Sequence, residues 1–147
     1  MSASTVDTLQ QLLALLCRSF PAYLVYAKPW TRFGEPSPQE HLTQIATDQQ
    51  ALADRVAEAI LEHGGVPRPT DFPMEFTDLH DLAAAYVLQL AVEYQKQDIE
   101  AIEGCVERLR MAPAARALAE EALGLAKGHL QVLRSLTNPG NLAAQVS

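Results

Sequence analysis

Three polar residues, Gln49, Glu93 and His129, occupy positions where the repeat of apolar residues calls for a hydrophobic side chain. Helix residues three or four positions apart share one face, so all three side chains are expected to point inward. A buried carboxylate is costly unless it is paired or bound to a metal. Glu93 therefore either hydrogen-bonds to His129, Gln49, Tyr23 or Tyr26, or ligates a metal ion together with His129. A small error in the repeat would instead turn Glu93 toward solvent.

The other candidate residues are weaker. His41, His63 and His80 fall near the ends of predicted helices, where histidines are usually surface residues. Cys17 and Cys105 are expected to be small buried residues, because free cysteines pack like hydrophobic side chains. The chain has no glycine-rich phosphate-binding loop.

Amphipathic helices must position these residues. Apolar side chains recur every three or four positions in four segments, at about residues 5–27, 37–63, 77–110 and 113–138. Pro21 predicts that the first helix is kinked or divided near Cys17. Residues 37–40 (SPQE) form a capping box at the start of the second helix, and Gly64 can end that helix in the left-handed conformation.

The connection over residues 64–76 sets the predicted topology. An extended linker of about twelve residues covers roughly 40 Å, which is the length of a helix of about 25 residues. The chain can therefore return along the whole bundle before the third helix begins, whereas the other two connections are short. The sequence predicts an all-α, single-domain protein over residues 1–147, a four-helix bundle with one long crossover between helices 2 and 3.

Composition excludes several classes of partner. The 147 residues are 48% hydrophobic and carry a formal net charge of −7, which argues against nucleic acids and anionic membranes as partners. No run of eighteen apolar residues occurs, and the N-terminus lacks the basic region of a signal peptide. We expect a soluble, cytoplasmic protein.

The chain resembles the ferritin-like superfamily, in its bacterioferritin- and rubrerythrin-like branch, over nearly its whole length. The similarity is carried by residues 22–26 (AYLVY), 52–60 (LADRVAEAI), 93–94 (EY) and 128–130 (GHL). Members that bind two irons use one Glu from helix one, Glu-x-x-His from helix two, one Glu from helix three and Glu-x-x-His from helix four. The metal pair then reacts with dioxygen or peroxide, or oxidises ferrous iron for storage.

Most of that ligand set is missing from this chain. Glu93 and His129 match the family positions, and they are the residual metal site that the resemblance implies. The other four positions carry residues that do not supply the family's ligands: Ser19, Gln49, Leu52 and Ala126. Two irons need several carboxylates to offset their charge, so one Glu and one His form at best a weak mononuclear site, aided by waters or by Asp48 or Asp98. We expect a degenerate di-iron centre.

Two functions are compatible with a ferritin-like fold whose di-iron centre is degenerate. The first is a non-catalytic scaffold or interaction protein that self-associates and needs no cofactor, and the resemblance favours a homodimer paired along helices one and two. The second is an iron-binding member, an iron store or a di-iron oxidase, with a non-standard ligand set. Aromatic and Met side chains in the connections would form a protein interface or cover the end of the bundle: Trp30, Phe33, Phe72, Met74 and Phe76.

Overall fold

A computed structural model describes residues 3–27, 39–68, 71–74, 76 and 84–137. Within these ranges the chain forms five α-helices and no strand: α1 (Ala3–Cys17), α2 (Phe20–Ala27), α3 (Gln39–Glu62), α4 (Ala84–Arg108) and α5 (Pro113–Thr137). The predicted all-α class is therefore confirmed. None of the described helices is both long enough and apolar enough to cross a bilayer.

The predicted break in the first helix is confirmed and has a clear local cause. The last backbone bond of α1 runs from the Arg18 amide to the Ala14 carbonyl (3.0 Å). Pro21, in the first turn of α2, has no amide hydrogen to continue the α1 ladder. Ser19 caps the new helix, because its Oγ accepts a hydrogen bond from the Ala22 amide (3.2 Å). The first column of the molecule is thus two helices, α1 and α2.

The other helix ends also follow local signals. Gly64 has a φ of 85°, as its predicted role after α3 requires, and the Gly65 amide donates back to the Ile60 carbonyl (2.9 Å). Pro113 begins α5 as predicted, at the position where a missing amide hydrogen costs least. The predicted cap at residues 37–38 and the first turns of the third helix at residues 77–83 lie outside the described residues.

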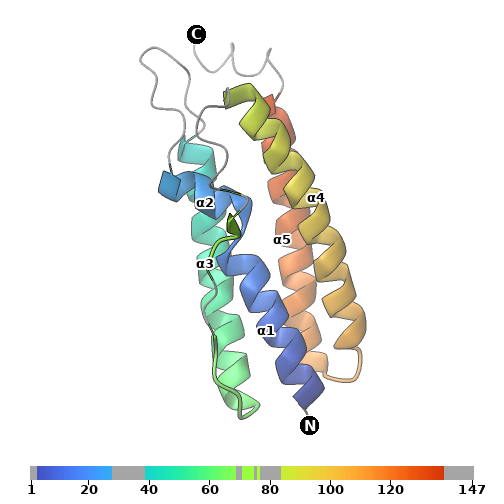
Figure 1. Cartoon of the computed structure of the whole chain (residues 1–147). Coiled ribbons are helices and arrows are strands. Elements are labelled where there is room, and N and C mark those ends of the chain that lie inside the picture. The colour runs from blue at the N-terminus through green and yellow to red at the C-terminus, as the bar shows by residue number, and fades with distance from the viewer. Residues whose placement is uncertain (1–2, 28–38, 69–70, 75, 77–83, 138–147) are drawn as a thin grey trace.

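The helices pack side by side along their lengths (Figure 1). α1 runs in the opposite direction to α3, α4 runs opposite to α5, and α3 and α4 run in the same direction, whereas the short helix α2 turns sideways across α3 (Figure 1). After α3 the chain is fastened to α1, because the side chain of Gln10 donates to the Val66 carbonyl (2.6 Å) and accepts from the Arg68 amide (3.1 Å). By Phe76 the chain has reached α2, where the Phe76 ring meets Phe20 (4.8 Å between centroids).

The buried hydrophobic residues form two clusters, one in each half of the molecule. The aliphatic core lies toward the N-terminus of α1 and is built of Leu, Ile, Val, Ala and Cys105, with Leu9, Leu12 and Val56 fully buried. The aromatic core lies around α2, and it includes Phe20, Tyr23, Phe76, Leu42, Ile45, Val87 and Leu133. The boundary between the two cores positions the polar residues described next.

Candidate functional site

A layer of buried polar side chains separates the two cores. Its members are Ser19, Gln49, Gln95 and His129, each no more than 6% exposed, and we call them the polar layer. They come from the α1–α2 break, α3, α4 and α5 respectively. On α3, for example, Gln49 lies between Ile45 of the aromatic core and Leu52 of the aliphatic core. Every helical column therefore contributes one polar group at the same level.

Ser19 and Gln49 form a neutral, buried hydrogen bond. The Ser19 hydroxyl donates to Gln49 Oε1 at 2.7 Å, while its oxygen also accepts from the Ala22 amide. A hydroxyl has one hydrogen to donate and two lone pairs, so this geometry uses its donor and one acceptor site. The bond joins the break in the first column to α3.

Gln95 joins α4 to α5. Its Nε2 donates to the Ala126 carbonyl at 2.9 Å, and the side chain is 1% exposed. Its Oε1 is buried and has no hydrogen-bond partner among the described residues. An unsatisfied buried acceptor is unfavourable, because it loses its bond to water without a replacement.

His129 is paired with a carboxylate at the edge of the layer. Its Nε2 lies 3.0 Å from Asp48 Oδ2, and this bond lowers the pKa of Asp48 below its ordinary value, with further help from the Gln44 amide. If Nε2 carries the proton that it shares with the carboxylate, Nδ1 is left as an acceptor. Nδ1 is buried and has no partner within the described part of the chain.

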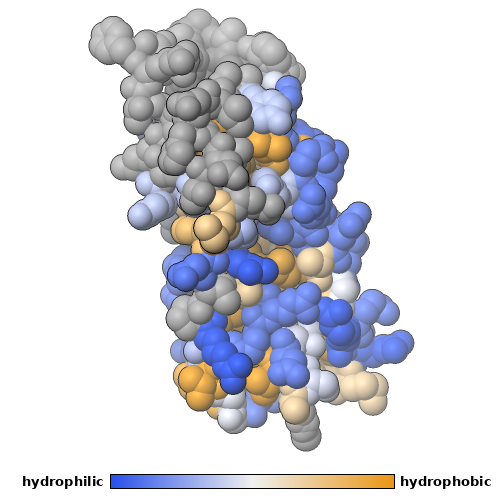
Figure 2. All heavy atoms as spheres, viewed as in Figure 1, coloured by the Kyte–Doolittle hydropathy of each residue, from blue (hydrophilic) through white to orange (hydrophobic). Residues whose placement is uncertain are grey.

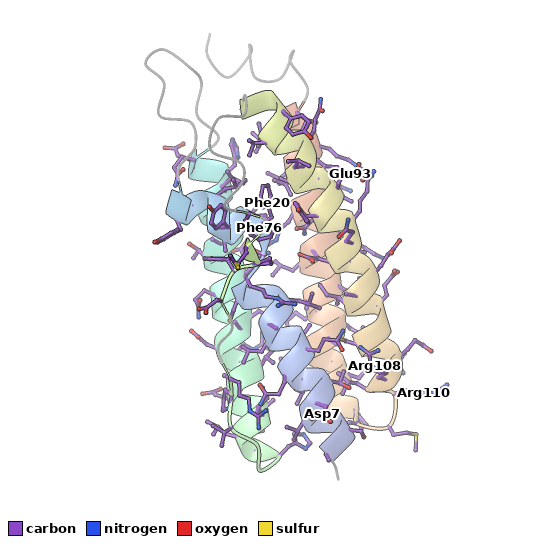
Figure 3. All side chains as sticks on the ribbon, in the orientation of Figure 1. Asp7, Phe20, Phe76, Glu93, Arg108 and Arg110 are labelled. Atoms are coloured by element: carbon purple, nitrogen blue, oxygen red, sulfur yellow. The ribbon has the colours of Figure 1, made fainter. Side chains whose placement is uncertain are left out.

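Glu93 does not join this layer, so its expected inward orientation is wrong. Its side chain is 64% exposed, forms an ion pair with Lys96 (3.3 Å) and lies on the outer side of α4 (Figure 3). The buried face of α4 runs instead through Val87, Leu88, Ala91 and Gln95, which is slightly rotated from the predicted repeat. The structure therefore does not bring Glu93 and His129 together, and the alternative of a solvent-facing Glu93 applies.

The remaining predicted residues are mostly where the sequence put them. His41 and His63 are exposed, and His80 lies outside the described residues. Cys105 is fully buried and Cys17 partly so, and burial raises the pKa of both thiols.

Among the aromatic and Met side chains of the connections, Phe76 is buried and Phe72 is half-buried against the aromatic core, so these two rings cover one end of that core, whereas Met74 is exposed. Trp30 and Phe33 lie outside the described residues.

Asp98 is a titratable group that the sequence pattern indicated only as a neighbour of the metal position. It follows Gln95 by three residues on α4, which places it on the adjacent turn of nearly the same face. Burial raises the pKa of Asp98 to about 7, although the nearby Arg18 guanidinium acts in the opposite direction. The spacing from Gln95 is the sequence signal that could have identified it.

The donors of the polar layer do not fit a pair of iron ions. Three of its four side chains are a hydroxyl or a neutral amide, and none of these supplies the negative charge that two divalent metals require. Within the described ranges, no group of three or more His, Cys, Asp and Glu side chains is arranged to hold a metal ion. What the arrangement can do is cross-link the four columns by hydrogen bonds.

The chain matches no model of a known protein family and no curated protein.

Proposed function

We propose that this protein is a ferritin-like four-helix bundle with one crossover that works as a non-catalytic, self-associating scaffold. One observation carries the proposal: three of the four side chains of the polar layer are uncharged hydroxyl or amide groups that bond to one another or to the backbone, as in Ser19–Gln49 and Gln95–Ala126. Two observations support the crossover. One is the set of helix directions in Figure 1, and the other is that the segment after α3 contacts α1 at Val66 and α2 at Phe76.

The chemistry of these groups favours a structural role. Amide and hydroxyl side chains stay uncharged at all physiological pH values, so Ser19, Gln49 and Gln95 need no cation to balance them. The inward position on α4 holds Gln95, and the carboxylate nearby, Glu93, pairs with Lys96 at the surface. A ferritin-like protein with these residues would retain the helical bundle but lack the carboxylate ligands that hold two irons.

An iron titration tests the metal-free interior. Purified protein is loaded anaerobically with ferrous iron and then exposed to air, with Glu93→Gln as a surface control. We expect no stoichiometric binding at micromolar iron and no oxygen-dependent oxidation by either protein. Two irons bound per chain, oxidised when oxygen is admitted, would overturn the proposal.

Self-association is proposed to occur along the side formed by α1 and α3. Leu61, near the end of α3, and Val66, just beyond it, are 59% and 70% exposed, and pairing along this side would cover them. Figure 2 shows hydrophobic surface at this end of the molecule. Exposed apolar area of this kind is a feature of association surfaces.

Light scattering on a sizing column measures this directly. The wild-type protein should run with the mass of two chains, and Leu61→Glu should shift it toward one. Met111→Glu is the matched control, because Met111 is 91% exposed but lies in the α4–α5 turn, away from the proposed surface. A wild-type monomer at high protein concentration would contradict the dimer.

Iron binding with a non-standard ligand set is the second candidate, and one observation favours it. Two buried lone pairs, Nδ1 of His129 and Oε1 of Gln95, have no partners among the described residues. Nitrogen and oxygen lone pairs are metal ligands, and the bond from Nε2 to Asp48 would fix the His129 tautomer that leaves Nδ1 free to bind a metal. In the titration above, binding of one iron that is abolished by His129→Leu but not by Glu93→Gln would support this candidate against the metal-free scaffold.

A further inference from the structure

A cavity of about 170 Å³ opens where the first column breaks. Its walls come from three parts of the chain: the end of α1 and start of α2, the segment before Phe76, and the middle of α4. An apolar cavity of about 150 Å³ accepts benzene, so this one has room for a six-membered ring with a small substituent.

One wall of the cavity is aromatic. The rings of Phe20, Phe76 and Tyr94 contact one another, with centroids 4.8 to 5.1 Å apart. Phe20 and Phe76 lie next to each other between α2 and α4 in Figure 3. Such a wall suits a flat ring, which gains from edge-to-face or offset contacts in addition to the burial of apolar area.

The rest of the lining includes polar side chains from two parts of the chain, Arg18 after α1 and Gln97 and Asp98 on α4. Arg18 and Asp98 both line the cavity and are close enough to influence each other electrostatically, yet they form no ion pair. Neither side chain has a hydrogen-bond partner among the described residues. Asp98 is therefore a half-buried carboxyl without a donor, held opposite a guanidinium whose five N–H groups match a carboxylate.

We propose that this cavity binds a small aromatic monocarboxylate, with its ring on Phe20, Phe76 and Tyr94 and its carboxylate between Arg18 and Asp98. Arg18 donates to one carboxylate oxygen, and protonated Asp98 donates its O–H to the other. The raised pKa of Asp98, about 7, keeps that proton available in mildly acidic solution. The ligand would satisfy both polar side chains at once.

Benzoate is the probe that tests the proposal. Isotope-labelled protein is titrated by NMR at about pH 6, below the Asp98 pKa of about 7. We expect saturable shifts of the amides around Arg18–Phe20 and Tyr94–Asp98, with a dissociation constant on the order of 1 mM or lower. Benzyl alcohol, which lacks the charge, should bind at least about tenfold more weakly.

Matched variants separate specific binding from a change in fold. Arg18→Gln should weaken benzoate binding by at least about tenfold, whereas Arg110→Gln, an exposed arginine at the far end of α4, should leave it unchanged. Asp98→Asn keeps a donor and should bind within about threefold of the wild type, while Asp98→Ala should lose about tenfold. Binding that is insensitive to Arg18→Gln, a preference for benzylamine over benzoate, or no saturable shift in the wild type would overturn the proposal. None of these outcomes depends on iron or on dimerisation.

Discussion

The two halves of the molecule are packed in different ways. In the aliphatic core α5 presents a line of alanines, Ala115, Ala119, Ala122 and Ala126, so that leucines of α1 fill the space between closely approaching helices. In the aromatic core the rings of Phe20 and Tyr23 from α2 pack against Phe76, and Tyr94 of α4 contacts both Phe20 and Phe76. Small residues permit close helix approach, whereas large rings fill irregular volume and leave edges unfilled.

This difference accounts for where polar chemistry is found. The aliphatic core contains no charged side chain, and its packing is continuous from Leu9 to Leu16 along α1. The polar layer and the cavity of Arg18 and Asp98 begin where that packing stops, at the break between α1 and α2. Four buried polar side chains thus lie at the boundary between the two hydrophobic cores, whereas Thr8, beside the aliphatic core, bonds to the Ser4 carbonyl within α1.

The largest expected effect comes from removing the ring at the centre of the aromatic core. Phe20→Ala should lower the free energy of unfolding by about 4 kcal/mol, since Phe20 is 1% exposed and contacts the rings of Tyr23, Phe76 and Tyr94. Urea unfolding measures the loss.

Its control is in the other core. Leu12→Ala should cost about 3 kcal/mol, but only Phe20→Ala should increase protease cleavage near Phe76, because Leu12 does not hold that segment. Equal cleavage in both variants would show that the two cores do not behave as separate units.

The second prediction concerns the pH dependence of stability that Asp98 causes at the boundary between the two cores. Burial raises the pKa of Asp98 from the ordinary 3.8 of an aspartate to about 7 on folding, so the unfolded chain loses this proton at a lower pH than the folded protein. The free energy of unfolding should therefore fall as the pH rises from about 4 to about 7, by up to roughly 3 kcal/mol, and level off above that range. Asp98→Asn should remove the decline and be the more stable protein at about pH 8.

Chemical unfolding at several pH values checks this, with Asp71→Asn, an exposed acid, as the control. A wild-type pH profile that Asp98→Asn leaves unaltered would contradict the assigned burial of Asp98.

The third prediction compares two glutamines of the polar layer. Gln49→Leu removes the acceptor of the buried Ser19 hydroxyl and should cost about 1.5 kcal/mol. Gln95→Leu loses the bond from Nε2 to the Ala126 carbonyl but also removes the buried Oε1 that has no partner among the described residues, so these effects offset and its cost should be within about 0.5 kcal/mol of zero. Thermal and urea unfolding of both variants give the comparison. The reverse order would mean that Gln95 contributes more to cross-linking the columns than Gln49.

The smallest effect is expected at Asp48. Its side chain is about one-third exposed, and its pKa is lowered mainly by the bond to His129, so the pair stabilises the protein above the ordinary pKa of a carboxyl. That contribution is lost as the pH falls through the lowered pKa of Asp48 in the folded protein. Asp48→Asn should therefore cost about 0.5 kcal/mol near neutral pH and nothing in strong acid. Urea unfolding of Asp48→Asn and the wild type at both pH values measures this difference in stability.

Much of the architecture was predictable because it depends on local signals. Pro21 cannot continue the hydrogen-bond ladder of a preceding helix but is tolerated in the first turn of a new one, and Gly64 adopts a positive φ at low cost, so both boundaries follow from residue type. The apolar repeat identified the helices for the same reason. For the candidate site, Gln49 and His129 were correctly predicted to be inward, since they lie on strongly periodic stripes.

The error at Glu93 shows where such reasoning fails. On α4 two neighbouring stripes are both apolar enough to be buried, and a small rotation about the helix axis exchanges Glu93 for Gln95 at the interior. The periodicity constrains the rotation only loosely, because a helix of 25 residues can bury either edge. Packing against Ala126 of α5 and against the aromatic rings decides it.

The amino-acid sequence alone determined the helical class, the helix boundaries within the described residues and the scarcity of carboxylates at the centre, since these depend on residue type and local spacing. Tertiary structure decided which polar groups meet: Ser19 with Gln49, Asp48 with His129, and Arg18 across a cavity from Asp98. These encounters depend on how each helix is rotated and how α2 leans away from α1, and such angles result from the packing of all the columns together.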